Sequence, residues 1–309
     1  MIKHACYIAI ASSLLGFATD VTAASATCAG ASLGQLGGAG KAWKLDDGGI
    51  AAFAKMNINI DGYGRAYHMK NGAGSLIHLC NAGRVVKPDG SSYEGSESNA
   101  TCTGRFMTDM AAIEAAGWKD TNIGVISWYG ILGTGSATVR GKRIANVVPV
   151  LQKDGSGFAV SPTTLADASI DDAADQSKYV NPLRIAAAVA PRGLIQQGVV
   201  MGSFGVAYDT KKKVAVPFVV GDAGPRIGEG SLALARLVAG LPLKDDIKKS
   251  ERFAGQVDRP DVLWIFFKDQ PARFDSHHEE ATTEKAREAF ETWGGDGRVQ
   301  ACVTAVPHG

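Results

Sequence analysis

Two carboxylates, Asp222 and Glu229, stand seven residues apart on either side of a glycine-rich loop that carries Arg226. The surrounding stretch, Phe218–Gly240, predicts a buried strand that ends at Gly221, then the loop, then a helix that begins just after Glu229. Because strand and helix fix both ends of a short loop, the two carboxylates could face one cleft. Hydrolysis of a glycosidic bond needs such a pair, since one carboxylic acid protonates the leaving oxygen and one carboxylate acts as base or nucleophile. Apolar neighbours would raise the pKa of Glu229, as the acid role requires.

The same two residues also have an ordinary structural interpretation. Asp222 could be a turn residue, and Glu229 could be an acidic residue at a helix N-terminus, where the helix dipole favours negative charge. Chemistry alone leaves both interpretations open.

Other catalytic and cofactor motifs give no consistent pattern. The Gly-x-Ser-x-Gly match at Gly30–Gly34 lacks the preceding strand that a nucleophile elbow needs. No phosphate-binding loop or dinucleotide fingerprint is complete. His277 and His278 are adjacent, so on a helix they would point in different directions, which disfavours a metal site. We therefore expect neither a cofactor nor a metal.

The elements that must position these groups are mostly short runs of β-branched and aromatic residues. Most runs are bounded by Gly, Pro, Asp or Lys, as strands usually are. Helices are predicted where a capping residue precedes a suitable run. The predicted strands are 56–60, 123–132, 144–151, 199–208, 214–220 and 262–267, and the predicted helices are 109–116 after Thr108, 232–239 after Ser231, and a helix capped by Ser276 with Glu279 that ends at Trp293.

The composition and the N-terminal sequence limit the classes of protein to which this chain can belong. The 32 Lys and Arg against 31 Asp and Glu among 309 residues give a net charge of +1, which argues against binding nucleic acid through charge. Lys3 precedes an apolar run, Ala5–Ala18, and small residues end at Ala23, which predicts a signal peptide over residues 1–23. That run is too short to span a membrane, and no later stretch is long enough. We expect a monomeric secreted or periplasmic protein, with a linker-like segment over 24–49 and one catalytic domain over 50–309 that ends in a helical extension.

Four cysteines, Cys28, Cys80, Cys102 and Cys302, remain after the predicted signal peptide. An even count in an oxidising compartment indicates two disulfides, with three possible connectivities. A Cys80–Cys102 bond would close a Gly- and Ser-rich excursion, and a Cys28–Cys302 bond would tie the two ends together, so we predict this pairing. Metal binding is the alternative, but the sequence has no Cys-x-x-Cys pair and no His at ligand spacing.

A resemblance to a known family adds to these observations. Seven residues between Gly221 and Ser231, just before a predicted helix, resemble in type and order the signature of glycoside hydrolase family 75, the chitosanases. Further pieces resemble the family in the same order, so the resemblance covers about residues 50 to 267. The signature residues are Gly221, Asp222, Gly224, Pro225, Gly228, Glu229 and Ser231, and the further pieces are Met56–Gly62, Arg65–His68, Gly157–Ser161, Thr164–Leu165, Tyr179–Asn181 and Val262–Phe267.

The resemblance implies a hydrolase of chitosan or a related amino-sugar polysaccharide, with an inverting mechanism and no cofactor. It implies Asp222 as general base and Glu229 as general acid, although the two roles could be exchanged. It also implies Asp61, Tyr67 and Arg226 as residues that bind the polysaccharide. For the fold we expect an α+β, β-rich domain with a barrel-like sheet core and a few peripheral helices, and analogy with other two-carboxylate hydrolases suggests a double-psi barrel.

The chain departs from the family pattern at three positions. Asn59 and Asn181 stand where acids are common in the family, and Ser203 stands where Gly-Asp is usual. Because chitosan is polycationic, the loss of carboxylates weakens the case for this substrate more than the case for the reaction. Two other functions therefore stay open: a non-catalytic glycan-binding envelope protein, and a peptidoglycan-directed hydrolase.

Overall fold

Short strands joined by loops make up most of this chain. The computed structural model describes residues 27–72, 74–268 and 271–308, so the predicted signal peptide lies outside the described residues. The helices are α1 (Asn99–Thr103), α2 (Arg105–Ala115), α3 (Arg192–Gln196), α4 (Leu232–Val238), α5 (Glu279–Trp293) and α6 (Gly295–Ala305). The strands are β1 (Gly30–Leu36), β2 (Ala39–Leu45), β3 (Ile50–Asn59), β4 (Gly83–Val86), β5 (Ser92–Glu94), β6 (Val125–Trp128), β7 (Gly133–Val139), β8 (Lys142–Pro149), β9 (Ala187–Pro191), β10 (Phe204–Asp209), β11 (Val214–Gly224), β12 (Glu229–Ser231) and β13 (Val257–Phe266).

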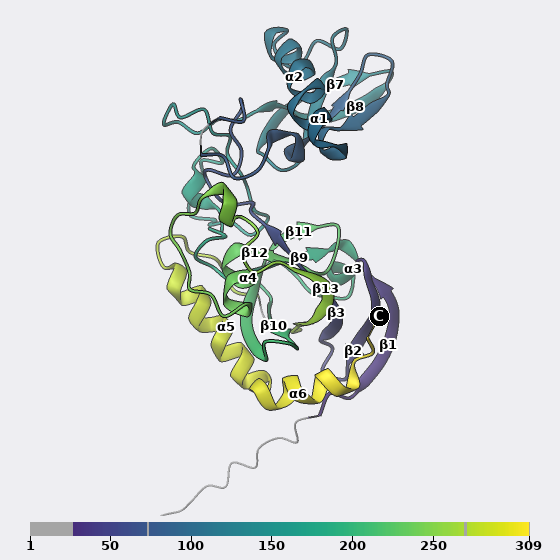
Figure 1. Cartoon of the computed structure of the whole chain (residues 1–309), viewed down its shortest axis with the longest axis vertical. Helices are drawn as coiled ribbons and strands as arrows, with labels where there is room; N and C mark the ends of the chain where they lie inside the picture. Colours follow the sequence, from purple (N-terminus) through teal and green to yellow (C-terminus); the bar gives the residue numbers. More distant parts are fainter. Residues whose placement is uncertain (1–26, 73, 269–270, 309) are drawn as a thin grey trace, which may run out of the picture.

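Six of the strands close into a barrel (Figure 1). Around the ring they follow the order β3, β12, β9, β11, β10 and β13, and β13 pairs again with β3. The pairs β9–β11 and β3–β12 are parallel, and the other neighbours in the ring are antiparallel. The predicted β-rich α+β class with a barrel-like sheet core is therefore confirmed, and every predicted strand range overlaps an observed strand.

The barrel strands are buried on both faces, which explains their nearly continuous apolar sequences. Side chains of β13 alternate between the two faces, as the period of a strand requires. Trp264 and Phe266 pack in one cluster with Leu234 of α4, whereas Ile265 packs in another with Phe290 of α5. In Figure 1, α5 runs along the outside of the barrel and α6 continues towards the β1–β2 hairpin.

Residues 30–45 form a hairpin rather than the predicted linker-like segment. β1 and β2 pair antiparallel, and β2 extends the sheet by pairing with β3. The strand signal is hidden because Gly and Ala replace the usual β-branched residues. Small residues are needed here, since a Cβ added at Gly30 would lie 2.2 Å from the carbonyl oxygen of Lys44.

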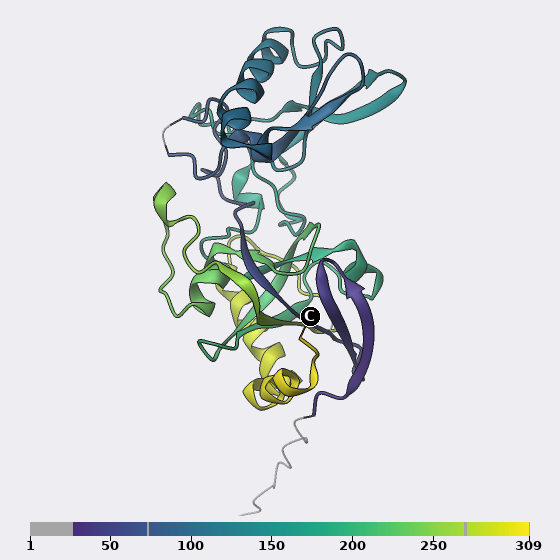
Figure 2. The same ribbon diagram turned by 45° about the vertical axis from the view of Figure 1, so that its right-hand side comes forward.

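Most of the chain between β3 and β9 lies in a smaller lobe beyond one end of the barrel (Figures 1 and 2). The smaller lobe contains the sheet β5-β4-β6, the hairpin β7–β8, and the helices α1 and α2. It has its own apolar cluster, in which Leu79, Phe106, Met110 and Trp128 are buried. The site described below lies where this lobe meets the barrel.

The three predicted helices exist, but their capping differs in part. Ser231 caps α4 as expected, because its side chain accepts a hydrogen bond from the Leu234 N–H. Thr108 does not cap α2, which begins three residues before it. Ser276 does not cap α5, because its hydroxyl donates to Asp167 instead. A further helix, α6, follows directly after the glycine that ends α5.

Both predicted disulfides are present. Cys28 bonds to Cys302 with a Cα–Cα distance of 4.9 Å, and this bond ties the segment before β1 to α6. Cys80 bonds to Cys102 with a Cα–Cα distance of 5.2 Å inside the smaller lobe. The predicted connectivity is therefore confirmed.

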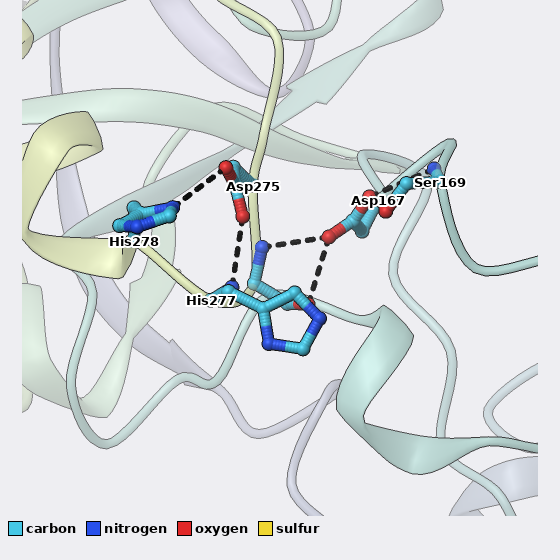
Figure 3. A network of polar contacts seen from close by, with 6 residues as sticks. Asp167, Ser169, Asp275, His277 and His278 are labelled. Atoms are coloured by element: carbon cyan, nitrogen blue, oxygen red, sulfur yellow. Dashed lines mark hydrogen bonds and ion pairs between the residues drawn. The ribbon is translucent and has the colours of Figure 1, made fainter.

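Asp167 fastens the segment before α5 to a loop beside the barrel (Figure 3). One carboxylate oxygen accepts hydrogen bonds from the N–H and the hydroxyl of Ser276, each at 2.8 Å. The other accepts from the N–H of Ser169 at 2.8 Å and from its hydroxyl at 2.6 Å. Asp167 is 3% exposed, and these four donors hold the pKa of its carboxyl well below the ordinary value.

We expect Asp167→Asn to lower the free energy of unfolding by roughly 2 kcal/mol at pH 7, because an amide cannot accept all four hydrogen bonds. The pKa of Asp167 is lower in the folded protein than in the unfolded chain. This stabilisation is therefore present above the unfolded pKa, near 3.9, and is lost as the pH falls below it. Urea unfolding at pH 7 and pH 3 measures this, with the exposed Asp171→Asn as control. Equal stability of wild type and Asp167→Asn at pH 7 would contradict the account.

Candidate active site

One cavity of about 710 Å³ lies between the barrel and the smaller lobe. The ends of β3, β11 and β12 form its barrel side, and residues near 67, 78 and 129 form its lobe side. The structure brings together all five residues that the sequence singles out for catalysis or polysaccharide binding. The five residues are Asp61, Tyr67, Asp222, Arg226 and Glu229.

Asp222 occupies an irregular position in the barrel. β11 extends to Gly224 rather than ending at Gly221, and its pairing with β9 shifts between Val220 and Asp222. Such an irregularity changes the direction in which the following side chain points.

Four donors then fix the Asp222 carboxylate. Oδ1 accepts from the Thr164 N–H at 2.9 Å, from the Thr164 hydroxyl at 2.7 Å and from the Ala223 N–H at 2.8 Å. Oδ2 accepts from the side-chain amide of Asn59 at 3.2 Å. An acceptor held by so many donors has a defined orientation.

Glu229 begins β12, where it pairs with Asn57 of β3. Its side chain is 19% exposed, and it accepts a hydrogen bond at 2.8 Å from Nε of Arg226 across the loop. Burial raises the pKa of Glu229, the charge of Arg226 lowers it, and the charge of Asp222 raises it; the net direction is upward. Gly224 allows β11 to pack against β9 here, because a Cβ at this position would lie 2.4 Å from Cγ1 of Val189.

Asp61 supplies a third carboxyl group. Burial raises its pKa well above the ordinary value, and the charge of Asp222 raises it further, although the Tyr67 hydroxyl opposes this by donating a hydrogen bond at 3.2 Å. Asn59 links the backbone of Asp61 to the Asp222 carboxylate, because its oxygen accepts from the Asp61 backbone N–H at 2.7 Å while its amide donates to Asp222. An ionised carboxylate at position 59 could not donate to Asp222, so the amide has a physical role here.

The other two departures from the family pattern do not line the cavity. Asn181 accepts from the Leu183 N–H at 3.0 Å and shapes a turn. Ser203 is 1% exposed, and its hydroxyl oxygen accepts from the Val200 N–H at 3.1 Å. Both side chains therefore stabilise local backbone away from the cavity.

Several residues of the cavity are not predicted as site residues by the sequence. Two aromatic side chains, Tyr129 and Phe253, line the cavity while remaining 55% and 52% exposed. Thr164 holds Asp222 without lining the cavity itself. His78 and Arg252 complete the lobe side and the rim. An exposed aromatic directly after a buried strand, as at Tyr129, is the one sequence signal for this set; the remaining residues come from separate loops.

No group of three or more His, Cys, Asp or Glu side chains within residues 27–72, 74–268 and 271–308 could hold a metal ion. His278 instead makes a 2.9 Å contact with Asp275 just before α5 (Figure 3). Across the same described ranges, no helix is both long and apolar enough to span a membrane.

The cavity thus combines an oriented carboxylate, a second carboxyl with a raised pKa, a third that is more strongly raised, and exposed aromatic rings. Such a set can activate water on one side of a bound molecule and protonate an oxygen on another. No model of a known protein family matches this chain, and no curated protein sequence matches it. The function of the cavity is therefore inferred from its residues.

Proposed function

We propose that this protein is a secreted glycoside hydrolase that cleaves chitosan or a related amino-sugar polysaccharide by an inverting two-carboxylate mechanism. One observation carries the proposal: Asp222 and Glu229 line the same cavity in different environments. Two titratable groups in contrasting environments are typical of a base and acid pair. Asp222, held by donors, is assigned as general base, and Glu229, with its raised pKa, as general acid.

The mechanism follows from these two assignments. Asp222 accepts a proton from a water molecule while the water oxygen attacks the anomeric carbon. Glu229 donates its proton to the glycosidic oxygen as the bond between that oxygen and the anomeric carbon breaks. Attack from the face opposite the leaving group inverts the anomeric configuration. Exchange of protons with solvent then restores both groups.

Other observations support the proposal. Four of the residues that resemble the chitosanase signature, Asp222, Gly224, Pro225 and Glu229, line the cavity. The two disulfides suit an exported protein. Tyr129 and Phe253 offer exposed rings on which sugars can pack. The double-psi form of the six-stranded barrel is part of the same proposal, by analogy with other two-carboxylate hydrolases.

The direct test is release of reducing ends by the purified mature chain from chitosan, N-acetylated chito-oligosaccharides and peptidoglycan glycan strands. We expect cleavage of at least one of these polymers. Binding without cleavage of any polymer would instead support a non-catalytic glycan-binding protein and would overturn the proposal.

The pKa of Glu229 should set the alkaline limb of the dependence of kcat/KM on pH. Glu229 must be protonated to act as acid, so activity falls as the pH rises through its pKa, which lies above 4.5. Since the Arg226 charge lowers that pKa, Arg226→Met is expected to move the alkaline limb of kcat/KM to higher pH. The exposed Arg143→Met is the control and should leave the limb in place. A limb that moves to lower pH in Arg226→Met would contradict the assignment of Glu229 as acid.

A further inference from the structure

Positive side chains stand at one part of the cavity that holds the three carboxyl groups. Arg252 lines the cavity, its Nη1 donates to the Lys249 carbonyl oxygen at 2.8 Å, and its guanidinium carbon lies 4.5 Å from the centre of the exposed Phe253 ring. Within the described residues, neither Arg252 nor Lys249 forms an ion pair with a carboxylate. Arg252, which lines the cavity, is therefore free to interact with a negatively charged ligand there.

His78 gives a second, independent indication at the same place. It lines the cavity, and its Nδ1 is buried without a hydrogen-bond partner among the described residues. Burial lowers the pKa of His78, and the charges of Lys249 and Arg252 lower it further, which places these cations close to the ring. An unsatisfied buried polar atom is costly, so a polar ligand at this position would be stabilising.

The charge at Arg252 does not favour a polycation. Burial raises the pKa of Asp61 and of Glu229, so each carries less negative charge than an exposed carboxylate at the same pH. Arg226 is paired with Glu229, whereas Arg252 lines the cavity without a carboxylate partner among the described residues. At Arg252 an ammonium group of a polycation would be repelled, whereas a carboxylate would be attracted.

Neutral polar groups of the cavity favour amides and hydroxyls. The side chains of Asn57, Asn81 and Asn99 line it together with Asn59. Each side-chain amide offers both a donor and an acceptor, which suits sugar hydroxyl and acetamido groups.

We propose that the polymer cleaved at this cavity is an N-acetylated amino-sugar chain that carries carboxylates, and that Arg252 and His78 receive a carboxylate there. This inference rests on the proposed hydrolase function, and it narrows the substrate class away from polycationic chitosan. The carboxylate could belong to a lactyl-peptide substituent, as on peptidoglycan strands, or to a uronic acid, as in hyaluronan. Both sources share one chemical feature, which is a carboxylate beside an N-acetylated sugar.

Binding measured by calorimetry tests the inference separately from catalysis. The ligands are soluble peptidoglycan strands with free peptide carboxylates, the same strands after amidation of those carboxylates, hyaluronan oligosaccharides, neutral chito-oligosaccharides and chitosan. At least one of the two carboxylated polymers should bind roughly ten-fold or more tightly than chitosan, as expected for a charge-assisted hydrogen bond. The stronger of the two identifies the source of the carboxylate, and if peptidoglycan strands are the stronger, amidation should remove the advantage.

Variants of Arg252 and His78 make the test specific to these two side chains. Arg252→Gln and His78→Asn should each reduce the preference for the carboxylated polymer over the neutral one, whereas the exposed Lys212→Gln should keep it. Thermal unfolding shows whether each variant is folded, and two variants at separate positions guard against a folding defect in one. Tightest binding to chitosan, or an unchanged preference in both folded variants, would overturn the inference. A retained preference without cleavage of any polymer would overturn the hydrolase proposal instead.

Discussion

Glu229→Gln and Asp222→Asn are each expected to lower kcat by roughly 100-fold or more, the usual scale of a general acid or base contribution. Each change keeps the shape of the side chain but removes the transferable proton or the negative charge. The melting temperature should change little for Glu229→Gln, because the side chain keeps its volume, and should fall for Asp222→Asn, because an amide cannot accept all four hydrogen bonds that hold Asp222. Measurements of kcat on the best polymer, with thermal unfolding of each variant, check both parts of this prediction.

The two roles can be told apart with an activated substrate. An aryl glycoside with a good leaving group needs no proton from the acid, so Glu229→Gln should lose much less activity on it than on the polymer. Asp222→Asn should lose activity on both substrates, because water must still be activated. The exposed Glu114→Gln and Asp171→Asn are matched controls. A Glu229→Gln protein that degrades the polymer at the wild-type rate would defeat the assignment.

Loss of the Cys28–Cys302 disulfide is expected to lower the free energy of unfolding by about 5 kcal/mol, because it closes a very long loop in the unfolded chain. The two cysteines are 274 residues apart, against 22 for Cys80 and Cys102. The same entropy argument gives about 3 kcal/mol for the shorter loop. Urea unfolding of the paired variants Cys28→Ser/Cys302→Ser and Cys80→Ser/Cys102→Ser measures both values.

Peptide mapping of the unreduced wild type by mass spectrometry is the control for this prediction. It should recover both disulfide-linked peptide pairs. Four free thiols, or a larger loss from the Cys80–Cys102 variant than from the Cys28–Cys302 variant, would contradict it.

The barrel strands can be predicted because burial on both faces leaves a strong local signal. β13 is the clearest case, with Leu263, Trp264 and Ile265 all fully buried. The β1–β2 hairpin cannot be predicted, since Gly and Ala give little strand preference and the fit against β3 is a tertiary contact. The helix α6 escapes prediction because Gly294 is a stop signal that ends α5, whereas the next helix starts immediately after it.

Part of the candidate site can be predicted from the sequence, and part cannot. Asp222 and Glu229 lie on adjacent elements, so their spacing along the chain allows a shared cleft to be predicted as one of two interpretations. Thr164, which orients Asp222, is 58 residues away in sequence, and only the folded chain brings the two together. The cations beside the cavity lie in a loop after α4, where a charged sequence is ordinarily interpreted as solvated surface. Contacts between residues so far apart along the chain leave no local pattern.

The configuration of the first product tests the two-carboxylate inverting mechanism most directly. Proton NMR of the new reducing end, recorded early in hydrolysis of a β-linked amino-sugar oligomer by the wild-type protein, identifies the anomer before it equilibrates. We expect the α-anomer to appear first, as direct attack of water between two separated carboxyl groups requires, and we expect the signal to be nearly absent with Glu229→Gln. Initial formation of the β-anomer, or no new reducing end from any amino-sugar polymer, would contradict the account.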